Sequence, residues 1–141
     1  MRVAITGATG FIGRRIASLL ESPQYLVRAL ARDAASARHL LAPGVEIVPG
    51  DLATPQALRA LVRDADAVLH LAGAVRGATR ADFDAANVDG SAALLAAMDA
   101  AAPHARLLFF SSLAAREPAL SHYAGSKQRA EQLLAHLESA T

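Results

Sequence analysis

The chain has 141 residues, of which 53% are hydrophobic and 19% are charged, and its formal net charge at pH 7 is +1. This length suits a single domain with a substantial core, and the balanced charge gives no reason to expect a nucleic-acid-binding protein. Because the sequence contains no cysteine, disulfides and thiolate metal sites are excluded. We find no signal peptide and no apolar segment long enough to enter a bilayer, and therefore expect a cytoplasmic protein without membrane insertion.

Short apolar runs alternate along the chain with longer helical patterns. The predicted strands are Val3–Thr6, Leu26–Ala31, Val45–Pro49, Ala67–Leu71 and Leu107–Ser111. The predicted helices are Phe11–Leu20, Ala34–Leu41, Pro55–Arg63, a segment within Asp82–Ala102, and Tyr123–Leu137. The strands are apolar at consecutive positions, as expected when helices cover both faces of a parallel sheet. The alternation predicts an α/β fold with a Rossmann-like, doubly wound sheet in the order 3-2-1-4-5, because crossovers are right-handed.

A glycine-rich turn, ITGATGFIG, joins the first strand to the first helix. Gly7 would permit the tight turn, Gly10 would let the main chain approach a diphosphate, and Gly13 would let the helix pack close to the sheet. The main-chain N–H groups that would then point at the anion belong to Thr9, Phe11 and Ile12. The position between a strand and a helix favours dinucleotide binding. The alternative is a glycine turn that connects the two elements and binds nothing.

Two residues that could move a proton stand one helical turn apart near the end of the chain. Tyr123 and Lys127 have the spacing i, i+4 and share one face of the predicted helix. A free tyrosine has a pKa of about 10, which is too high for a base at neutral pH. A lysine ammonium beside the phenol favours the phenolate. The alternative is a surface tyrosine whose ring packs against the lysine stem.

These motifs follow one another in a familiar order: TGxxGxxG, then the serine pair of LLFFSSLAA, then SHYAGSKQRAEQLL. The chain resembles the short-chain dehydrogenase/reductase superfamily, and GATGFIG is similar to its extended branch of epimerase/dehydratase and dihydroflavonol-reductase-like proteins. The resemblance implies an NAD(P)-binding Rossmann domain over residues 1–141 with catalytic Ser112, Tyr123 and Lys127. Ser112 is preferred to Ser111 because the family's catalytic serine is usually the last of this run.

The end of the second strand bears on the choice of cofactor. VRALARD resembles the corresponding segment of NADPH-dependent members, so Arg32 would clamp a 2′-phosphate, with Arg14 adding charge. Two alternatives remain: Arg32 is a solvated loop residue while Asp33 caps the next helix, or Asp33 itself binds a ribose. The resemblance therefore favours NADP and leaves NAD open.

The resemblance assigns further cofactor contacts. Asp51 and Leu52 follow the third strand, where a family carboxylate accepts a hydrogen bond from the adenine amino group; the alternative is that Asp51 belongs to the start of the next helix. The segment after the fourth strand, Leu71, Ala72 and Gly73, would line the ribose and phosphate. Asn87 resembles an asparagine that approaches the cofactor, although it could instead tie a helix to a strand.

The resemblance implies an NAD(P)-dependent oxidoreductase or epimerase acting on a carbonyl or secondary alcohol of a small molecule. The connection from Leu113 to His122 is shorter than in many extended members, and such members continue beyond this helix with elements that form the substrate pocket. Two alternatives to an active enzyme therefore remain: a non-catalytic dinucleotide-binding accessory or sensor subunit, and an inactive fragment of a longer reductase. An open sheet edge would favour a homo-oligomer or a partner subunit. The histidines show no metal-ligand spacing.

Overall fold

The computed structural model describes residues 1–138 and groups the chain into two compact units. Unit 1 contains residues 1–72 and 93–110, and unit 2 contains residues 73–92 and those from 111 onward. The expectation that residues 1–141 form a single NAD(P)-binding domain stays a prediction. Each unit is described separately below.

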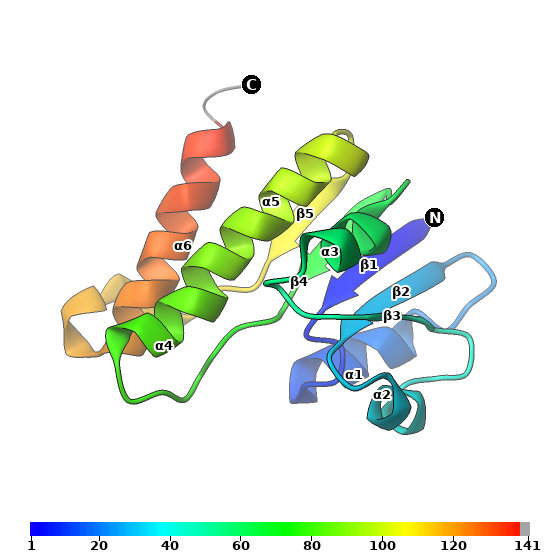
Figure 1. Cartoon of the computed structure of the whole chain (residues 1–141), viewed down its shortest axis with the longest axis horizontal. Coiled ribbons are helices and arrows are strands. Elements are labelled where there is room, and N and C mark those ends of the chain that lie inside the picture. Colours follow the sequence, from blue (N-terminus) through cyan, green and yellow to red (C-terminus); the bar gives the residue numbers. More distant parts are fainter. Residues whose placement is uncertain (139–141) are drawn as a thin grey trace. The chain divides into compact units, whose positions relative to one another are not determined.

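Unit 1 is built on one parallel sheet (Figure 1). Its strands are β1 (Arg2–Thr6), β2 (Leu26–Ala31), β3 (Glu46–Pro49), β4 (Ala67–His70) and β5 (Arg106–Phe109). They lie in the order β3-β2-β1-β4-β5, and Ile5 of β1 stands beside Ala29 of β2 and Leu69 of β4. The structure thus confirms the α/β fold and the Rossmann-like strand order expected from the sequence.

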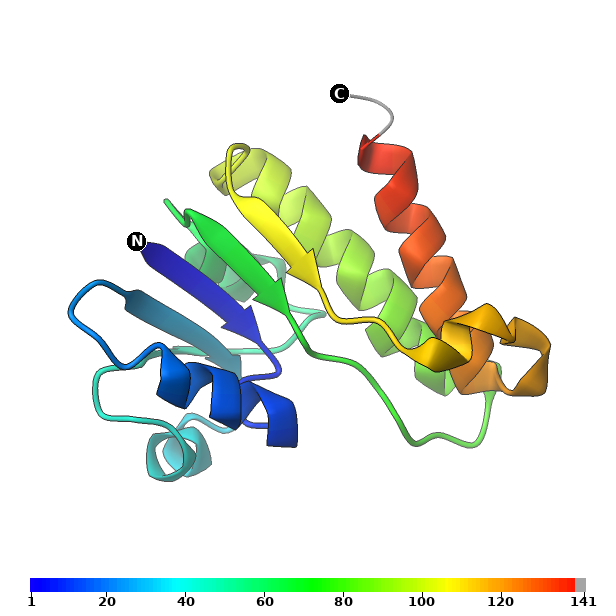
Figure 2. The ribbon, with the colours of Figure 1, turned by 180° about the vertical axis from the view of Figure 1, so that it is seen from behind.

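Helices cover both faces of this sheet because side chains alternate along each strand. The helices of unit 1 are α1 (Phe11–Leu19), α2 (Ala34–Leu40), α3 (Pro55–Val62) and the part of α5 (Gly90–Ala101) from residue 93 onward. On one face, Ala4 packs in a core with Leu58 of α3 and Leu94 of α5. On the other face, Ile5 packs in a core with Ala17 of α1. Figure 2 shows α1 and α2 on the face opposite α3 and α5.

The turn after β1 depends on two glycines. Gly7 has φ +72°, and a Cβ atom there would lie 2.6 Å from the main-chain nitrogen of Ala72. At Gly13 a Cβ atom would lie 2.1 Å from the carbonyl oxygen of Gly7. Both contacts involve main-chain atoms, which cannot rotate away as a side chain can. The first turn of α1 therefore approaches the end of β1 more closely than any residue with a side chain would allow.

Unit 2 is helical. It contains α4 (Arg80–Asp84), the π-helical turn η1 (Ala85–Asp89), the start of α5, two 3₁₀ turns, η2 (Leu113–Arg116) and η3 (Pro118–Leu120), and α6 (His122–Glu138). Thr79 and Asp82 form a reciprocal capping box at the start of α4. The carboxylate of Asp84 pairs with Arg129, which joins α4 to α6.

Several predicted boundaries differ from the structure. The predicted fifth strand is wrong at its C-terminal end, because β5 stops at Phe109, two residues before Ser111. The side chain of Ser112 instead accepts a hydrogen bond from the Ala114 N–H and starts η2, a local pattern that competes with strand pairing. The turns η2 and η3 were not predicted. Among the described residues, no helix combines the length and apolarity needed to cross a membrane.

We expect Gly13→Ala to lower the free energy of unfolding by about 1–3 kcal/mol or more, since overpacking against main chain forces the turn to move. Gly44→Ala is the matched control, because a Cβ atom at Gly44 would meet nothing within 4 Å. The measurement is urea unfolding followed by circular dichroism. Equal stability of the two variants would contradict the close packing described for α1.

Candidate functional site

The start of α1 offers main-chain donors to an anion. Gly10 occupies the N-cap position, no side chain caps the helix, and no acidic residue stands in its first turn. Gly10 is exposed, and a Cβ atom there would meet only the Gly7 carbonyl oxygen, at 3.2 Å. The next two side chains, Phe11 and Ile12, are 87% and 54% exposed. An open, uncapped helix N-terminus beside a bare glycine fits the diphosphate of a dinucleotide.

A buried hydrogen-bond group fixes the main chain beside this turn. The Thr6 hydroxyl and Nδ1 of His70 lie 2.6 Å apart, and the Ala72 N–H donates to the same hydroxyl at 3.2 Å. His70 is almost fully buried and its ring lies against Phe109. The structure therefore brings the predicted residues Leu71 and Ala72 close to Gly7 within unit 1. The role of Thr6 was missed, because a threonine inside a strand resembles any other β-branched core residue.

Arg32 and Asp33 follow β2, and the structure gives them different surroundings. Asp33 is the N-cap of α2: its carboxylate accepts hydrogen bonds from the N–H groups of Ala35 and Ser36. The side-chain and main-chain hydrogen bonds of Ser36, together with that of Ala35, hold the pKa of Asp33 below its usual value. Arg32 is exposed. The helix cap that the alternative assigned to Asp33 is thus confirmed, and both Arg32 and Asp33 are exposed at this strand end.

Asp51 is also engaged at the start of a helix. Its Oδ1 atom accepts hydrogen bonds from the Ala53 N–H at 3.0 Å and from the Thr54 hydroxyl at 2.8 Å, just before α3. Leu52 is half-buried and packs against the core beneath α3. The alternative interpretation of Asp51 as part of the helix start is therefore confirmed, and a contact with an adenine amino group stays a prediction.

In unit 2, Asn87 ties three segments together. Its Oδ1 atom accepts from the Ala74 N–H at 2.7 Å, and its Nδ2 group donates to the Ala74 carbonyl and to the Ser126 hydroxyl. Ser126 in turn donates to the Tyr123 carbonyl at 2.7 Å. Asn87 is buried, and a Cβ atom at Gly73 would lie 2.7 Å from its Oδ1 atom. These contacts match the alternative in which Asn87 ties structural elements together. The sequence did not predict the hydrogen bonds of Ser126.

The two serines that follow β5 have separate partners. The Ser112 hydroxyl accepts the Ala114 N–H at 3.2 Å and is partly exposed. The Ser111 hydroxyl donates to the carboxylate of Glu131 on α6. Ser112 therefore keeps its hydroxyl hydrogen for another acceptor, whereas the hydrogen of Ser111 is committed. This difference supports the choice of Ser112 over Ser111. The hydrogen bond between Ser111 and Glu131 was not predicted from the sequence.

Tyr123 and Lys127 occupy successive turns of α6, as the spacing predicted. The ring of Tyr123 is half-buried and meets the ring of Phe83 edge-on, with 6.1 Å between centroids. Lys127 is 5% exposed and is the only lysine in the sequence. Burial lowers the pKa of Lys127, and the charge of Glu131 opposes this effect. The structure therefore places a buried amine one helical turn after the Tyr123 phenol.

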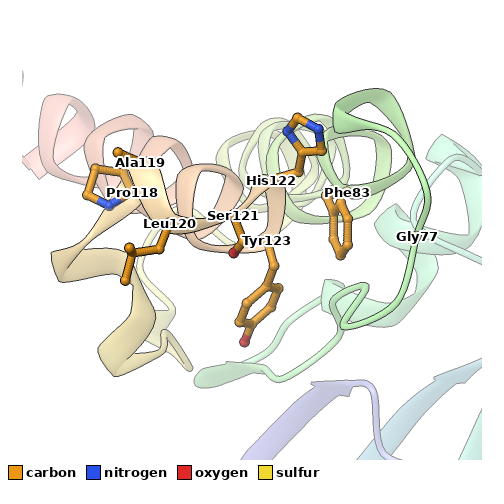
Figure 3. Close-up of a pocket in the computed structure, with 8 residues that line it drawn as sticks. All are labelled: Gly77, Phe83, Pro118, Ala119, Leu120, Ser121, His122 and Tyr123. Carbon is orange, nitrogen blue, oxygen red and sulfur yellow. The ribbon is translucent and has the colours of Figure 1, made fainter.

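A cavity of about 520 Å³ opens beside Tyr123 within unit 2 (Figure 3). The lining residues are Gly77, Phe83, Pro118, Ala119, Leu120, Ser121, His122 and Tyr123. Figure 3 shows the Tyr123 ring beside that of Phe83, with its hydroxyl at the end far from α6. The volume lies within the range of small-molecule sites, about 300–1,000 Å³. Within residues 1–138, no three histidine or acidic side chains are grouped to hold a metal ion.

The chain belongs to the NAD dependent epimerase/dehydratase family, whose sequence model matches residues 3–140. It falls in the extended branch of the short-chain dehydrogenase/reductase superfamily, as the sequence suggested. This family is NAD-dependent, and solved structures similar to this chain contain bound NAD.

Two curated relatives illustrate the similarity. Ceramide reductase of Caulobacter vibrioides is 45% identical over 139 residues, covering 92% of this chain and 40% of the relative. D-erythronate dehydrogenase of Cupriavidus necator is 38% identical over 127 residues, covering 81% and 39%. The chain thus spans about two fifths of the length of these relatives. A short-chain dehydrogenase/reductase superfamily protein of Agrobacterium tumefaciens with bound NAD superposes with a TM-score of 0.80, at 27% identity, over 95% of this chain and 44% of that chain.

The buried charge of Lys127 predicts a pH-dependent stability. At pH 7 the folded protein buries an ammonium; as the pH rises through the lowered folded-state pKa toward 10.5, the folded state releases its proton before the unfolded state does, and this cost disappears. We expect Lys127→Met to raise the midpoint of thermal unfolding at pH 7, with an advantage that shrinks toward pH 10.

Because the chain contains one lysine, labelling with isotopic lysine gives a single side-chain amine signal by NMR. Its titration measures the pKa directly. A pKa at or above 10.5, or a methionine variant whose advantage grows with pH, would contradict the burial effect.

Proposed function

We propose that this chain carries the cofactor-binding and proton-transfer residues of an NAD(P)-dependent oxidoreductase or epimerase that acts on a carbonyl or secondary alcohol. The observation that carries the proposal is the pairing on α6 of Tyr123, which lines a cavity, with the buried ammonium of Lys127 one turn away. Relatives named reductase and dehydrogenase, at 45% and 38% identity, support the same class of reaction.

In the proposed mechanism, the bound nicotinamide supplies or accepts hydride at the substrate carbon. The phenol of Tyr123 donates a proton to the substrate oxygen in reduction and removes it in oxidation. In this proposal the Lys127 ammonium, one turn after Tyr123 on α6, stabilises the phenolate that remains after proton donation, and it can also hold the cofactor ribose.

Ser112 positions the substrate oxygen. Its hydroxyl accepts one main-chain N–H in η2, so the hydrogen that it carries can be donated to the oxygen that Tyr123 protonates. Two donors on one oxygen also stabilise the negative charge that develops there during reduction. The chain Asn87–Ser126–Tyr123 holds the main chain of α6 at this point, which limits the movement of the phenol.

Unit 1 supplies the contacts for the cofactor in this proposal. The main-chain N–H groups of Thr9, Phe11 and Ile12 would hold the diphosphate, with Gly7, Gly10 and Gly13 shaping the turn. Arg32 would hold a 2′-phosphate, so we propose a preference for NADP over NAD. The exposure of Arg32 and the engagement of the Asp33 carboxylate as a helix cap support this preference, because Arg32 is free to meet a phosphate while Asp33 already accepts hydrogen bonds from α2.

Tyr123→Phe tests the proton donor. We expect NADPH-dependent ketone reduction, followed by absorbance at 340 nm, to fall by about 10²–10⁴-fold, the usual contribution of a general acid. The dissociation constant for NADPH, measured by its fluorescence, should change by less than about threefold, because the residues of unit 1 proposed to bind the cofactor are unaltered. Tyr25→Phe is the matched control, since Tyr25 is the other tyrosine and lies in unit 1. Full activity of Tyr123→Phe would refute the assigned role, and cofactor binding without any turnover would favour an accessory or sensor protein.

Arg32→Ala tests the cofactor preference. We expect the dissociation constant for NADPH to rise by about 10- to 100-fold, which is the loss expected when charge-assisted hydrogen bonds to a phosphate are removed. The dissociation constant for NADH should change little. Calorimetric titration with both nucleotides measures this. Arg59→Ala on α3 is the control, because Arg59 is also exposed. An equal loss for the two nucleotides, or no loss, would show that Arg32 does not select the phosphate.

A further inference from the structure

The geometry points to an uncharged substrate whose reacting carbonyl or alcohol carries an aliphatic chain. This inference rests on the proposed function, because it assigns the cavity beside Tyr123 to the substrate. It goes further in naming the chemical class that the cavity accepts.

Four of the eight residues that line the cavity have apolar side chains. Phe83 stands beside Tyr123, and Leu120 and Pro118 of the turn η3 line the other side (Figure 3). The Leu120 side chain and the Tyr123 ring project to the same side of α6, whereas the His122 ring projects to the opposite side. An aliphatic chain attached to the carbon that reacts at Tyr123 could therefore lie against Leu120 and Pro118.

The lining contains one imidazole, that of His122, and its ring projects to the side of α6 opposite the Tyr123 ring. No lysine, arginine, aspartate or glutamate is among the eight lining residues. The nearby carboxylate of Asp82 accepts the N–H groups of Ala78 and Thr79, and that of Asp84 pairs with Arg80 and Arg129. A carboxylate or phosphate at the far end of a chain lying against Leu120 and Pro118 would meet no lysine or arginine of the lining, so contact with these apolar side chains would be unfavourable.

The exposure of Leu120 supplies the driving force for binding an aliphatic chain. Leu120 is 80% exposed although it stands in a turn that packs on α6. Covering an apolar surface gains about 25 cal/mol per Å², which corresponds to about a fourfold gain in affinity for each methylene buried. The polar groups of the lining, among them the Tyr123 hydroxyl, would then orient the single oxygen of the substrate.

The test uses methyl ketones of four to ten carbons, each paired with a keto acid of similar length that ends in a carboxylate. We expect kcat/KM for NADPH-dependent reduction to rise about fourfold per methylene until the cavity is filled, and to fall at least about tenfold when the chain ends in a carboxylate. A flat dependence on chain length, or a preference for the keto acids, would overturn the inference.

Binding is measured separately, by saturation-transfer NMR on Tyr123→Phe, so that turnover is not needed. Binding that strengthens with chain length in the absence of turnover by the original protein would support the apolar site and contradict the proposed function. Turnover that ignores chain length would contradict the apolar site and leave the proposed function standing.

Leu120→Gln and Leu19→Gln form a matched pair, since both leucines are exposed, at 80% and 63%, and Leu19 lies on α1 in unit 1. We expect Leu120→Gln to reduce kcat/KM for the ten-carbon ketone about tenfold and that for the four-carbon ketone less than twofold. Leu19→Gln should change neither. If Leu120→Gln lowers the melting temperature instead and leaves the chain-length dependence intact, Leu120 packs against another part of the protein and the inference fails.

Discussion

The whole of unit 1 depends on the approach of main chain to main chain where β1 passes into α1. Gly7 lies against the main chain of Ala72, and Gly13 lies against the carbonyl of Gly7. This contact sets the distance between the first helix and the sheet, and it leaves the helix N-terminus bare. Because Thr6 bonds to both His70 and Ala72, the same point of the sheet also fixes the end of β4. The exposed, uncapped N-terminus of α1 is thus a direct result of packing without side chains.

Unit 2 follows a different design, in which buried side-chain hydrogen bonds replace a sheet. Asn87 and Ser126 connect the segment after β4, the π-helical turn and α6, and the ion pair of Asp84 with Arg129 connects α4 with α6. Such networks specify position more sharply than apolar contacts do, because an unpaired buried polar group is costly. The position of α6, which carries Tyr123 and Lys127, is therefore determined in part by these buried hydrogen bonds and this ion pair.

The sequence was sufficient for the sheet, because the apolar runs and the right-handed crossovers allow few arrangements. It also placed Tyr123 and Lys127 correctly on one helix, because their i, i+4 spacing is a local property of the sequence. It failed at the end of β5, where the Ser112 side chain competes with strand pairing, and at Ser126 and Glu131. Their partners lie 39 and 20 residues away along the chain. No periodic pattern encodes such contacts, so only the folded structure shows them.

The single lysine also bears on how the composition of this chain is interpreted. Of the 14 lysine and arginine residues, only Lys127 is a lysine, although either residue would serve at an exposed position where only positive charge is needed. A guanidinium is planar, bulky and permanently protonated, whereas an ammonium is compact and can lose its proton. The chain therefore uses arginine as its general source of positive charge and an amine at the one buried place beside a phenol. An arginine at position 127 would keep the positive charge, but its guanidinium is larger than an amine and would not lose its proton.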